Sequence, residues 1–148
     1  VLAIVGWVTP ADGWPHPLIS GLGMGTALVG IALAVVAQHE MGVTWQIGVD
    51  TDEHTTLITD GVFARVRNPF FTSMVMVAFG LVALVPTPVS ALAVACLVVA
   101  VEIQVRSLEE PYLTATHGSA YTAYAATAGR FLPLVGRLST RDARNSHS

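Results

Sequence analysis

The chain has 148 residues, of which 53% are hydrophobic and only 11% are charged. Soluble domains carry about 25% charged residues, so this composition argues against a water-soluble enzyme and favours a protein embedded in lipid. Seven arginines, no lysine and ten acidic residues give a net charge of −3, which argues against a nucleic-acid-binding protein. The single cysteine, Cys96, cannot form a disulfide within the chain.

Four apolar stretches predict an all-α, polytopic transmembrane protein. Residues 1–8 are too short to span a bilayer, and we interpret them as a partial span. Residues 18–37 contain no charge and match the ~30 Å hydrocarbon core of a bilayer. Residues 69–85 and 89–105 predict two further spans, separated by Pro86-Thr87-Pro88, since proline cannot continue a helix interior. We therefore expect three full spans and a partial N-terminal one.

Small residues in the first full span predict close packing between helices. The run Gly21-Leu22-Gly23-Met24-Gly25 resembles a dinucleotide loop, but it lies inside an apolar stretch instead of following a strand. Gly21, Gly25 and Gly30 are better explained as positions where neighbouring helices approach.

The arginines predict the orientation in the membrane. Arg65 and Arg67 precede the span 69–85, Arg106 follows the span 89–105, and the other four lie further along the chain. If the chain alternates across the membrane, all seven lie on one side, which the positive-inside rule assigns to the cytoplasm. We expect a multi-pass protein of the plasma membrane with its polar chemistry on the cytoplasmic side.

The cytoplasmic part consists of residues 38–68 and the segment after Arg106. We expect a short cytoplasmic or interfacial helix near residues 108–126. We assign residues 1–136 to a single domain and residues 137–148 to a disordered polar tail, because that tail lacks aromatic residues. The spacing of the five histidines predicts no metal site.

Ionisable residues cluster where two predicted spans reach the cytoplasmic face. Glu102, Arg106 and Glu109 are spaced i, i+4 and i+7, which places them on one face of a helix, with Glu110 adjacent. Arg67-Asn68-Pro69 stands where another span begins, and asparagine followed by proline is typical of a helix N-terminus. Two helix ends rich in Arg, Asn and Glu are thus expected to meet. The alternative is structural: Arg67 and Arg106 pair with Glu109 and Glu110 and only fix the helix ends.

Two motifs in these regions resemble the isoprenylcysteine carboxyl methyltransferases and their phospholipid-methyltransferase relatives. The first half of that family signature has a Thr-x-Gly turn and an Arg-x-Pro, and the second half has a Glu-Glu pair, two tyrosines and a closing Arg-Phe-Leu-Pro. The matching residues are Leu57–Phe71 in the first half and Glu109–Leu113, His117-Gly118, Tyr121, Tyr124 and Arg130–Pro133 in the second. The stretch Met41–Trp45 is similar to a Gly-x-Ser-Trp stretch of bacterial members. The resemblance covers residues 38–133.

The resemblance implies an integral-membrane methyltransferase that uses S-adenosylmethionine and releases S-adenosylhomocysteine. It places the cofactor in a cytoplasmic-side pocket that includes Arg67, Asn68, Pro69, Phe71, Glu109, Glu110, Tyr121 and Tyr124. The chain departs from the signature at Asn68, where the family has His, at Phe71, where it has Tyr, and at Val62-Phe63, where it has Pro-Tyr.

These residue types suit the reaction that the resemblance implies. The Arg67 guanidinium can hold the cofactor's carboxylate in two-pronged geometry, the glutamates can accept from its ammonium or ribose hydroxyls, and Phe71 can cover its adenine ring or the cation. A carboxylate or thiolate acceptor needs no general base, so catalysis rests on alignment and exclusion of water. An amine acceptor would need one, and Glu102 or Glu109 is the candidate. We count Arg67, Glu109 and Glu102 as the candidate catalytic residues.

The acceptor is expected to be lipophilic, most simply a carboxylate on a small isoprenoid, a lipid or a lipidated substrate that enters from the membrane. The Ala-, Val- and Gly-rich, lysine-free composition is typical of a high-GC bacterium. Two alternatives remain open at this stage: a nicotinamide-dependent membrane reductase of similar architecture, and a non-catalytic membrane subunit that kept the fold.

Overall fold

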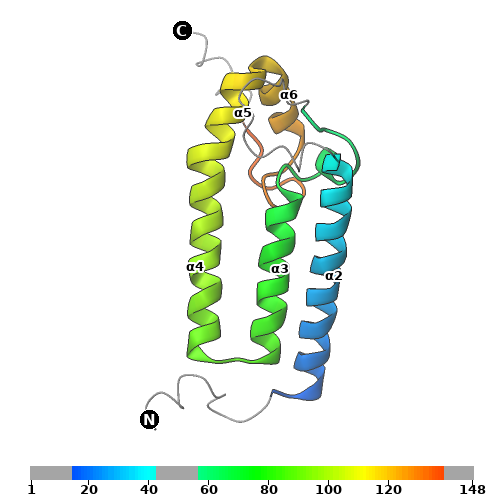
Figure 1. Ribbon diagram of the computed structural model, residues 1–148, viewed down its shortest axis with the longest axis vertical. Helices are drawn as coiled ribbons and strands as arrows, with labels where there is room; N and C mark the ends of the chain where they lie inside the picture. The colour runs from blue at the N-terminus through cyan, green and yellow to red at the C-terminus, as the bar shows by residue number, and fades with distance from the viewer. Residues whose placement is uncertain (1–14, 43–56, 139–148) are drawn as a thin grey trace.

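The computed structural model describes residues 15–42 and 57–138, and these residues are helical apart from turns and loops. Three long helices, α2 (Pro17–Met41), α3 (Pro69–Leu84) and α4 (Pro88–Gln104), lie side by side with α3 between the other two (Figure 1). A short 3-10 helix, η2 (Gly61–Ala64), precedes α3. A π-helical segment, η3 (Val105–Glu109), joins α4 to α5 (Glu110–His117), and α6 (Ser119–Thr127) follows.

The helices begin where the sequence supplies helix-starting residues. Proline occupies the first turn of α2, α3 and α4, where its missing N–H costs nothing. Before α4, Thr87 and Ser90 form a reciprocal capping box, so the hairpin at Pro86-Thr87-Pro88 has the tight break that the prolines predict. Asn68 precedes α3 as expected, but its side chain does not cap the helix.

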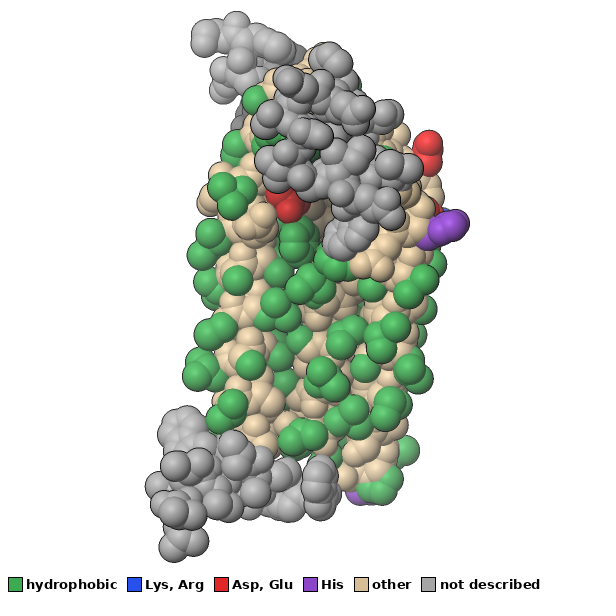
Figure 2. Space-filling view, in the orientation of Figure 1, with side chains coloured by type: hydrophobic (Ala, Val, Ile, Leu, Met, Phe, Trp, Pro, Cys, Tyr) green, Lys and Arg blue, Asp and Glu red, His purple; other side chains and the backbone are tan. Residues whose placement is uncertain are grey.

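Among the residues that the structure describes, two helices are long and apolar enough to cross a membrane: α2, and the continuous helical stretch Pro88–His117. Only 17% of the apolar window of each is buried within the protein, so neither is the buried core of a soluble domain. Apolar side chains cover the visible face of all three long helices, and charged side chains lie near the helix ends (Figure 2). The expected count of three full spans is not confirmed, because α3 has 16 residues and is only about 24 Å long at 1.5 Å per residue.

Helix α3 packs chiefly on α2, and glycines make the close approach. A Cβ atom at Gly80 would lie 2.6 Å from the carbonyl oxygen of Gly23, and one at Gly30 would lie 2.8 Å from Val77. No atom of the described residues lies within 4 Å of a Cβ placed at Gly21 or Gly25, so these two take no part in the packing of α2 on α3, whereas Gly30 does as expected. Gly23, Ala27 and Gly30 are spaced i, i+4 and i+7 and share one face, whereas Gly21 and Gly25 lie on another.

The single helix expected near residues 108–126 is also a misprediction. The structure divides this region at Gly118, which has φ +52° and separates α5 from α6. Glycine adopts this left-handed conformation without steric cost, so the chain can turn there. The expected partial span 1–8, most of the Met41–Trp45 stretch and the tail beyond residue 138 lie outside the described residues.

Candidate functional site

The two sequence motifs meet through backbone hydrogen bonds at one end of the helices. Arg67 N–H donates to the carbonyl of Gly129 at 2.7 Å, and Gly129 N–H donates to the carbonyl of Arg65 at 3.0 Å. Asn68 adds two bonds to the carbonyl of Arg130, from its backbone N–H at 3.1 Å and from its side-chain Nδ2 at 3.2 Å. These bonds fix the segment 65–68, just before α3, against the segment 129–130, just after α6.

Arg67 lies at the centre of the site, with only 2% of its side chain exposed. Its Nη1 donates to Glu110 Oε1 at 2.9 Å and to the Tyr121 hydroxyl at 3.1 Å. Its Nη2 donates to the carbonyl of Gly136 at 2.6 Å. Its Nε is buried without a hydrogen-bond partner among the described residues. A buried N–H group on a charged side chain is costly to leave unpaired, so this atom is the position of the site most in need of an acceptor.

Glu110 is held between two arginines. Arg130 binds it in a two-pronged arrangement, Nε to Oε1 at 2.7 Å and Nη2 to Oε2 at 2.9 Å, while Arg67 shares Oε1. The hydrogen bonds to Glu110 raise the pKa of Arg130 above its usual value, because they favour the charged form. Arg130 is missing from the residues predicted for the site. The signal for it was its place in the closing Arg-Phe-Leu-Pro of the second motif.

The two tyrosines of α6 support the site from the other side. Tyr121 is buried, and Tyr124 donates its hydroxyl proton to the carbonyl of Phe63 at 2.7 Å. Burial raises the pKa of Tyr124 to about 12, and it also raises that of Tyr121 although the Arg67 charge opposes the shift. Both phenols are therefore neutral hydrogen-bonding groups at physiological pH.

A cavity of about 250 Å³, which we call the polar pocket, brings most of the predicted residues together. Six of them line it: Arg67, Asn68, Glu109, Glu110, Tyr121 and Tyr124. The remaining lining residues are mainly apolar: Met41, Leu57, Ile58, Phe63, Tyr112, Leu113 and His117. The predicted meeting of Arg67 with the glutamate doublet is confirmed in its geometry, and the partner of Arg67 is Glu110. Glu109 also lines this pocket but takes part in no ion pair among the described residues.

Three predicted residues lie outside the polar pocket. Pro69 lines a different cavity, and Phe71 packs edge-on against Phe70 and lines neither of these two cavities. Glu102 pairs with Arg106, so the structural alternative in which Arg106 pairs with Glu109 or Glu110 is wrong on this point. Glu102 also borders a small apolar pocket between α3 and α4. Since Glu102 reaches neither Arg67 nor Glu109 in this structure, its candidacy as a general base receives no geometric support.

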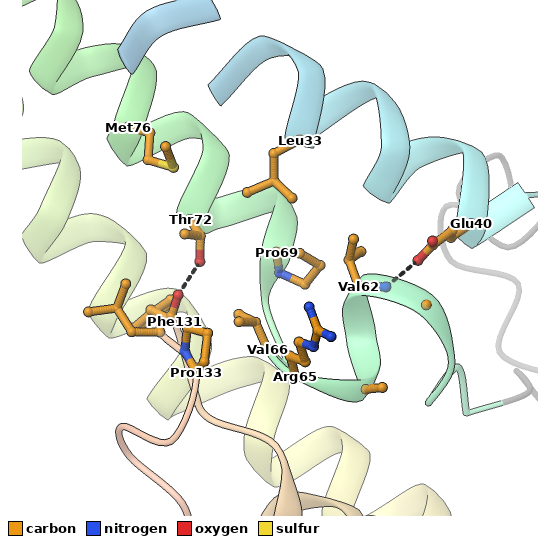
Figure 3. A pocket seen from close by; sticks show the side chains of 13 residues that line it. Leu33, Glu40, Val62, Arg65, Val66, Pro69, Thr72, Met76, Phe131 and Pro133 are labelled. Atoms are coloured by element: carbon orange, nitrogen blue, oxygen red, sulfur yellow. Dashed lines mark hydrogen bonds between the residues drawn. The ribbon is translucent and has the colours of Figure 1, made fainter. Parts of the chain in front are cut away.

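A second, larger cavity of about 630 Å³ lies between α2, α3 and the loop after Gly129 (Figure 3). We call it the apolar cavity, since its lining is mainly aliphatic, proline or phenylalanine and includes Leu33, Val66, Met76, Phe131 and Pro133. Two charged residues, Glu40 and Arg65, also line it, and a Glu40 carboxylate oxygen accepts the Val62 N–H at 2.8 Å. This cavity could not be expected from the sequence, because its walls come from three separate stretches of chain: α2, residues 61–76 and residues 131–133.

The two cavities lie on either side of one short segment. Arg65, Val66 and Pro69 line the apolar cavity, whereas Arg67 and Asn68 line the polar pocket. Chemically, the polar pocket offers carboxylates, phenols and the Arg67 side chain, whose buried Nε has no partner among the described residues, and the apolar cavity offers a wall that suits a lipid chain. The arrangement can therefore hold a polar, zwitterionic molecule close to an apolar one.

Comparisons with known proteins show the family to which the chain belongs. The phospholipid methyltransferase family pattern matches residues 18–120 of the chain. Protein-S-isoprenylcysteine O-methyltransferases A and B of Arabidopsis thaliana are each 29% identical over 122 residues, which cover 81% of this chain and 62% of the relative. The chain thus spans 62% of the length of the curated relatives that it matches. No solved structure matches it. On the extent of the family match, this chain belongs to the phospholipid methyltransferase family.

Proposed function

We propose that this protein is an integral-membrane methyltransferase that uses S-adenosylmethionine to methylate a lipophilic acceptor. The observation that carries the proposal is Arg67, whose buried Nε has no hydrogen-bond partner among the described residues and whose side chain lines a pocket with Glu109 and two tyrosines. The names of its relatives support methyl transfer as the reaction class.

The residues present fit the amino-acid end of this cofactor. The carboxylate of the cofactor would supply the acceptor that Arg67 Nε lacks. Because Nη1 and Nη2 of Arg67 already donate to protein groups, they cannot also bind this carboxylate in a two-pronged arrangement without rearrangement. Glu109 would accept from the cofactor's ammonium or ribose hydroxyls. A volume of about 250 Å³ is slightly below the ~300 Å³ of the smallest drug-sized sites, so the polar pocket as described suits only part of the molecule.

S-adenosylmethionine supplies an electrophilic methyl group when bound. The chain's own contribution is then to orient the two reactants and to exclude water. Arg130 and Arg67 hold Glu110 in place, and Tyr124 holds η2 through its hydrogen bond to the carbonyl of Phe63. The apolar cavity offers a place for the hydrocarbon part of the acceptor. We propose a carboxylate as the methyl-accepting group, since it is already nucleophilic and needs none of these residues as a base.

We further propose that the reaction takes place at the cytoplasmic face of the plasma membrane. Arg65, Arg67, Arg106 and Arg130 belong to segments at the end of the bundle where α2 and α4 finish and α3 begins (Figure 1), as the positive-inside rule requires for that side. We include α3 as a third, short span, because a short helix is accommodated by local thinning of the bilayer. Residues 1–136 would then form one domain.

The test is equilibrium binding of S-adenosylhomocysteine to the purified protein in lipid nanodiscs, measured by calorimetry. We expect the wild type and the Arg106→Ala variant to bind alike, because Arg106 pairs with Glu102 away from the polar pocket. Glu109→Gln should bind more weakly and remain folded, since Glu109 takes no part in the ion pairs around Arg67. Absence of binding by the wild type, or unchanged binding by Glu109→Gln, would refute this assignment of the pocket. Binding of NADPH in its place would favour a reductase.

A further inference from the structure

The loop Phe131–Gly136, which follows Arg130, is compact but presents apolar side chains outward. Arg130 N–H donates to the carbonyl of Val135 at 2.7 Å, and Val135 N–H donates to the carbonyl of Leu132 at 3.1 Å, so the loop is closed on itself. Leu134 has φ +72° and is the one non-glycine residue with positive φ among those described. Leucine rarely adopts this conformation, so the loop holds a specific backbone shape.

Three large apolar side chains of this loop are more than half exposed. The exposed fractions are 56% for Leu132, 69% for Leu134 and 59% for Val135. An exposed group of this kind on a short loop marks an interaction site when it is contiguous with other apolar surface.

The position of the loop identifies what it contacts. Phe131 carbonyl accepts the Thr72 hydroxyl at 2.7 Å, which ties the loop to the first turns of α3. Leu132 borders the same small pocket as Val98 and Val101 of α4, so the apolar loop surface continues into the apolar sides of α3 and α4. These are the helix surfaces that face lipid in the proposed membrane placement.

Charge supports the same partner. Arg137, which is exposed, follows the loop directly, whereas Arg130, which precedes the loop, is bound to Glu110 and is not available to lipid. An exposed arginine next to apolar side chains is typical of segments that lie at the boundary between lipid headgroups and acyl chains, because the cation reaches the phosphates while the apolar groups enter the hydrocarbon.

We propose that the loop Phe131–Gly136 is a membrane anchor that inserts Leu132, Leu134 and Val135 into the lipid beside α3 and α4. The inference rests on the proposed membrane placement of the chain. It has a consequence for the site, because the carbonyl of Gly136 accepts the Nη2 hydrogen bond of Arg67 at 2.6 Å. The lipid surface would thereby steady one of the three groups that hold Arg67.

The test uses fluorescent probes on single cysteines in proteoliposomes. In a Cys96→Ser background, Leu134→Cys and, separately, Val135→Cys receive an environment-sensitive fluorophore, and Asp60→Cys serves as the water-exposed control. The native Cys96, exposed on α4, serves as the control for lipid. Quenching is measured with iodide in the water and with phospholipids that carry a spin label either near the headgroup or near the chain end.

We expect the probes at positions 134 and 135 to emit at shorter wavelength than the probe at position 60 and to be several-fold less quenched by iodide. They should be quenched most by the spin label near the headgroup, and the Cys96 probe most by the label near the chain end. Iodide quenching at 134 and 135 equal to that at 60, with the Cys96 probe still quenched by lipid labels, would overturn the anchor and leave the membrane placement intact. A Cys96 probe that no lipid label quenches would overturn the membrane placement itself.

Discussion

Replacing Arg67 by alanine tests whether the buried charge network holds this end of the protein together. The substitution removes the bonds to Glu110, Tyr121 and Gly136 while Arg130 stays on Glu110. Breaking a buried ion pair costs about 3–5 kcal/mol. With Tm changing by about 2–4 °C per kcal/mol in a chain of this size, we expect Tm to fall by about 6–20 °C.

The assay is thermal unfolding of the purified protein in detergent, followed by circular dichroism. Arg106→Ala is the matched control, because Arg106 and Glu102 keep 59% and 37% of their side chains exposed, and an exposed pair contributes only about 0–1 kcal/mol. If both variants lower Tm by the same small amount, the reasoning from burial is wrong. If Arg67→Ala alone unfolds at a lower temperature, the buried network is a main source of stability at the site.

Three further predictions follow from single contacts. Gly80→Ala should destabilise the protein by about 1–3 kcal/mol through overpacking against Gly23. Gly25→Ala should not lower Tm, because none of the described residues lies within 4 Å of the added methyl group; equal effects of the two substitutions would contradict the packing face. Tyr124→Phe removes the hydrogen bond to the carbonyl of Phe63 and should lower the free energy of unfolding by about 0.5–1.5 kcal/mol, measured by chemical denaturation. An unchanged free energy of unfolding would show that this bond does not stabilise the protein. The raised pKa of Tyr124, about 12 in the folded protein, predicts stability that is complete below pH ~10 and declines as the pH rises toward that value; a decline that is just as steep in Tyr124→Phe would exclude Tyr124 as its source.

The positions of the long helices could be predicted because proline and apolar length fix them. The expected stretches 18–37, 69–85 and 89–105 correspond to α2, α3 and α4. The packing face of α2 could not be predicted in the same way. Nearly every residue there is apolar, so no contrast between polar and apolar positions shows which side meets α3. The structure selects Gly23 and Gly30, and the sequence offered Gly21 and Gly25 with equal plausibility.

The meeting of Arg67 with the glutamate doublet could also be predicted, because both stand at helix ends on one side of the hairpin. The roles of Arg130 and of the apolar cavity could not, since they depend on how the chain after α6 folds back onto the start of α3. Phe71 shows the limit of transferring a motif residue by residue. Its place in the motif matched, but its ring packs on Phe70 outside the polar pocket.

The π-helical turn between α4 and α5 has a consequence for how this chain tolerates changes in length. One wide turn accommodates one residue more than an α-helix would, so Glu110 occupies the angular position that an uninterrupted helix gives to Glu109. Removing one exposed residue, Ser107, should therefore convert η3 to ordinary helix and keep the former Glu110 aimed at Arg67. The same deletion inside α4 would instead turn every later side chain by about 100°, so the two deletions separate a tolerated shortening from a disruptive one.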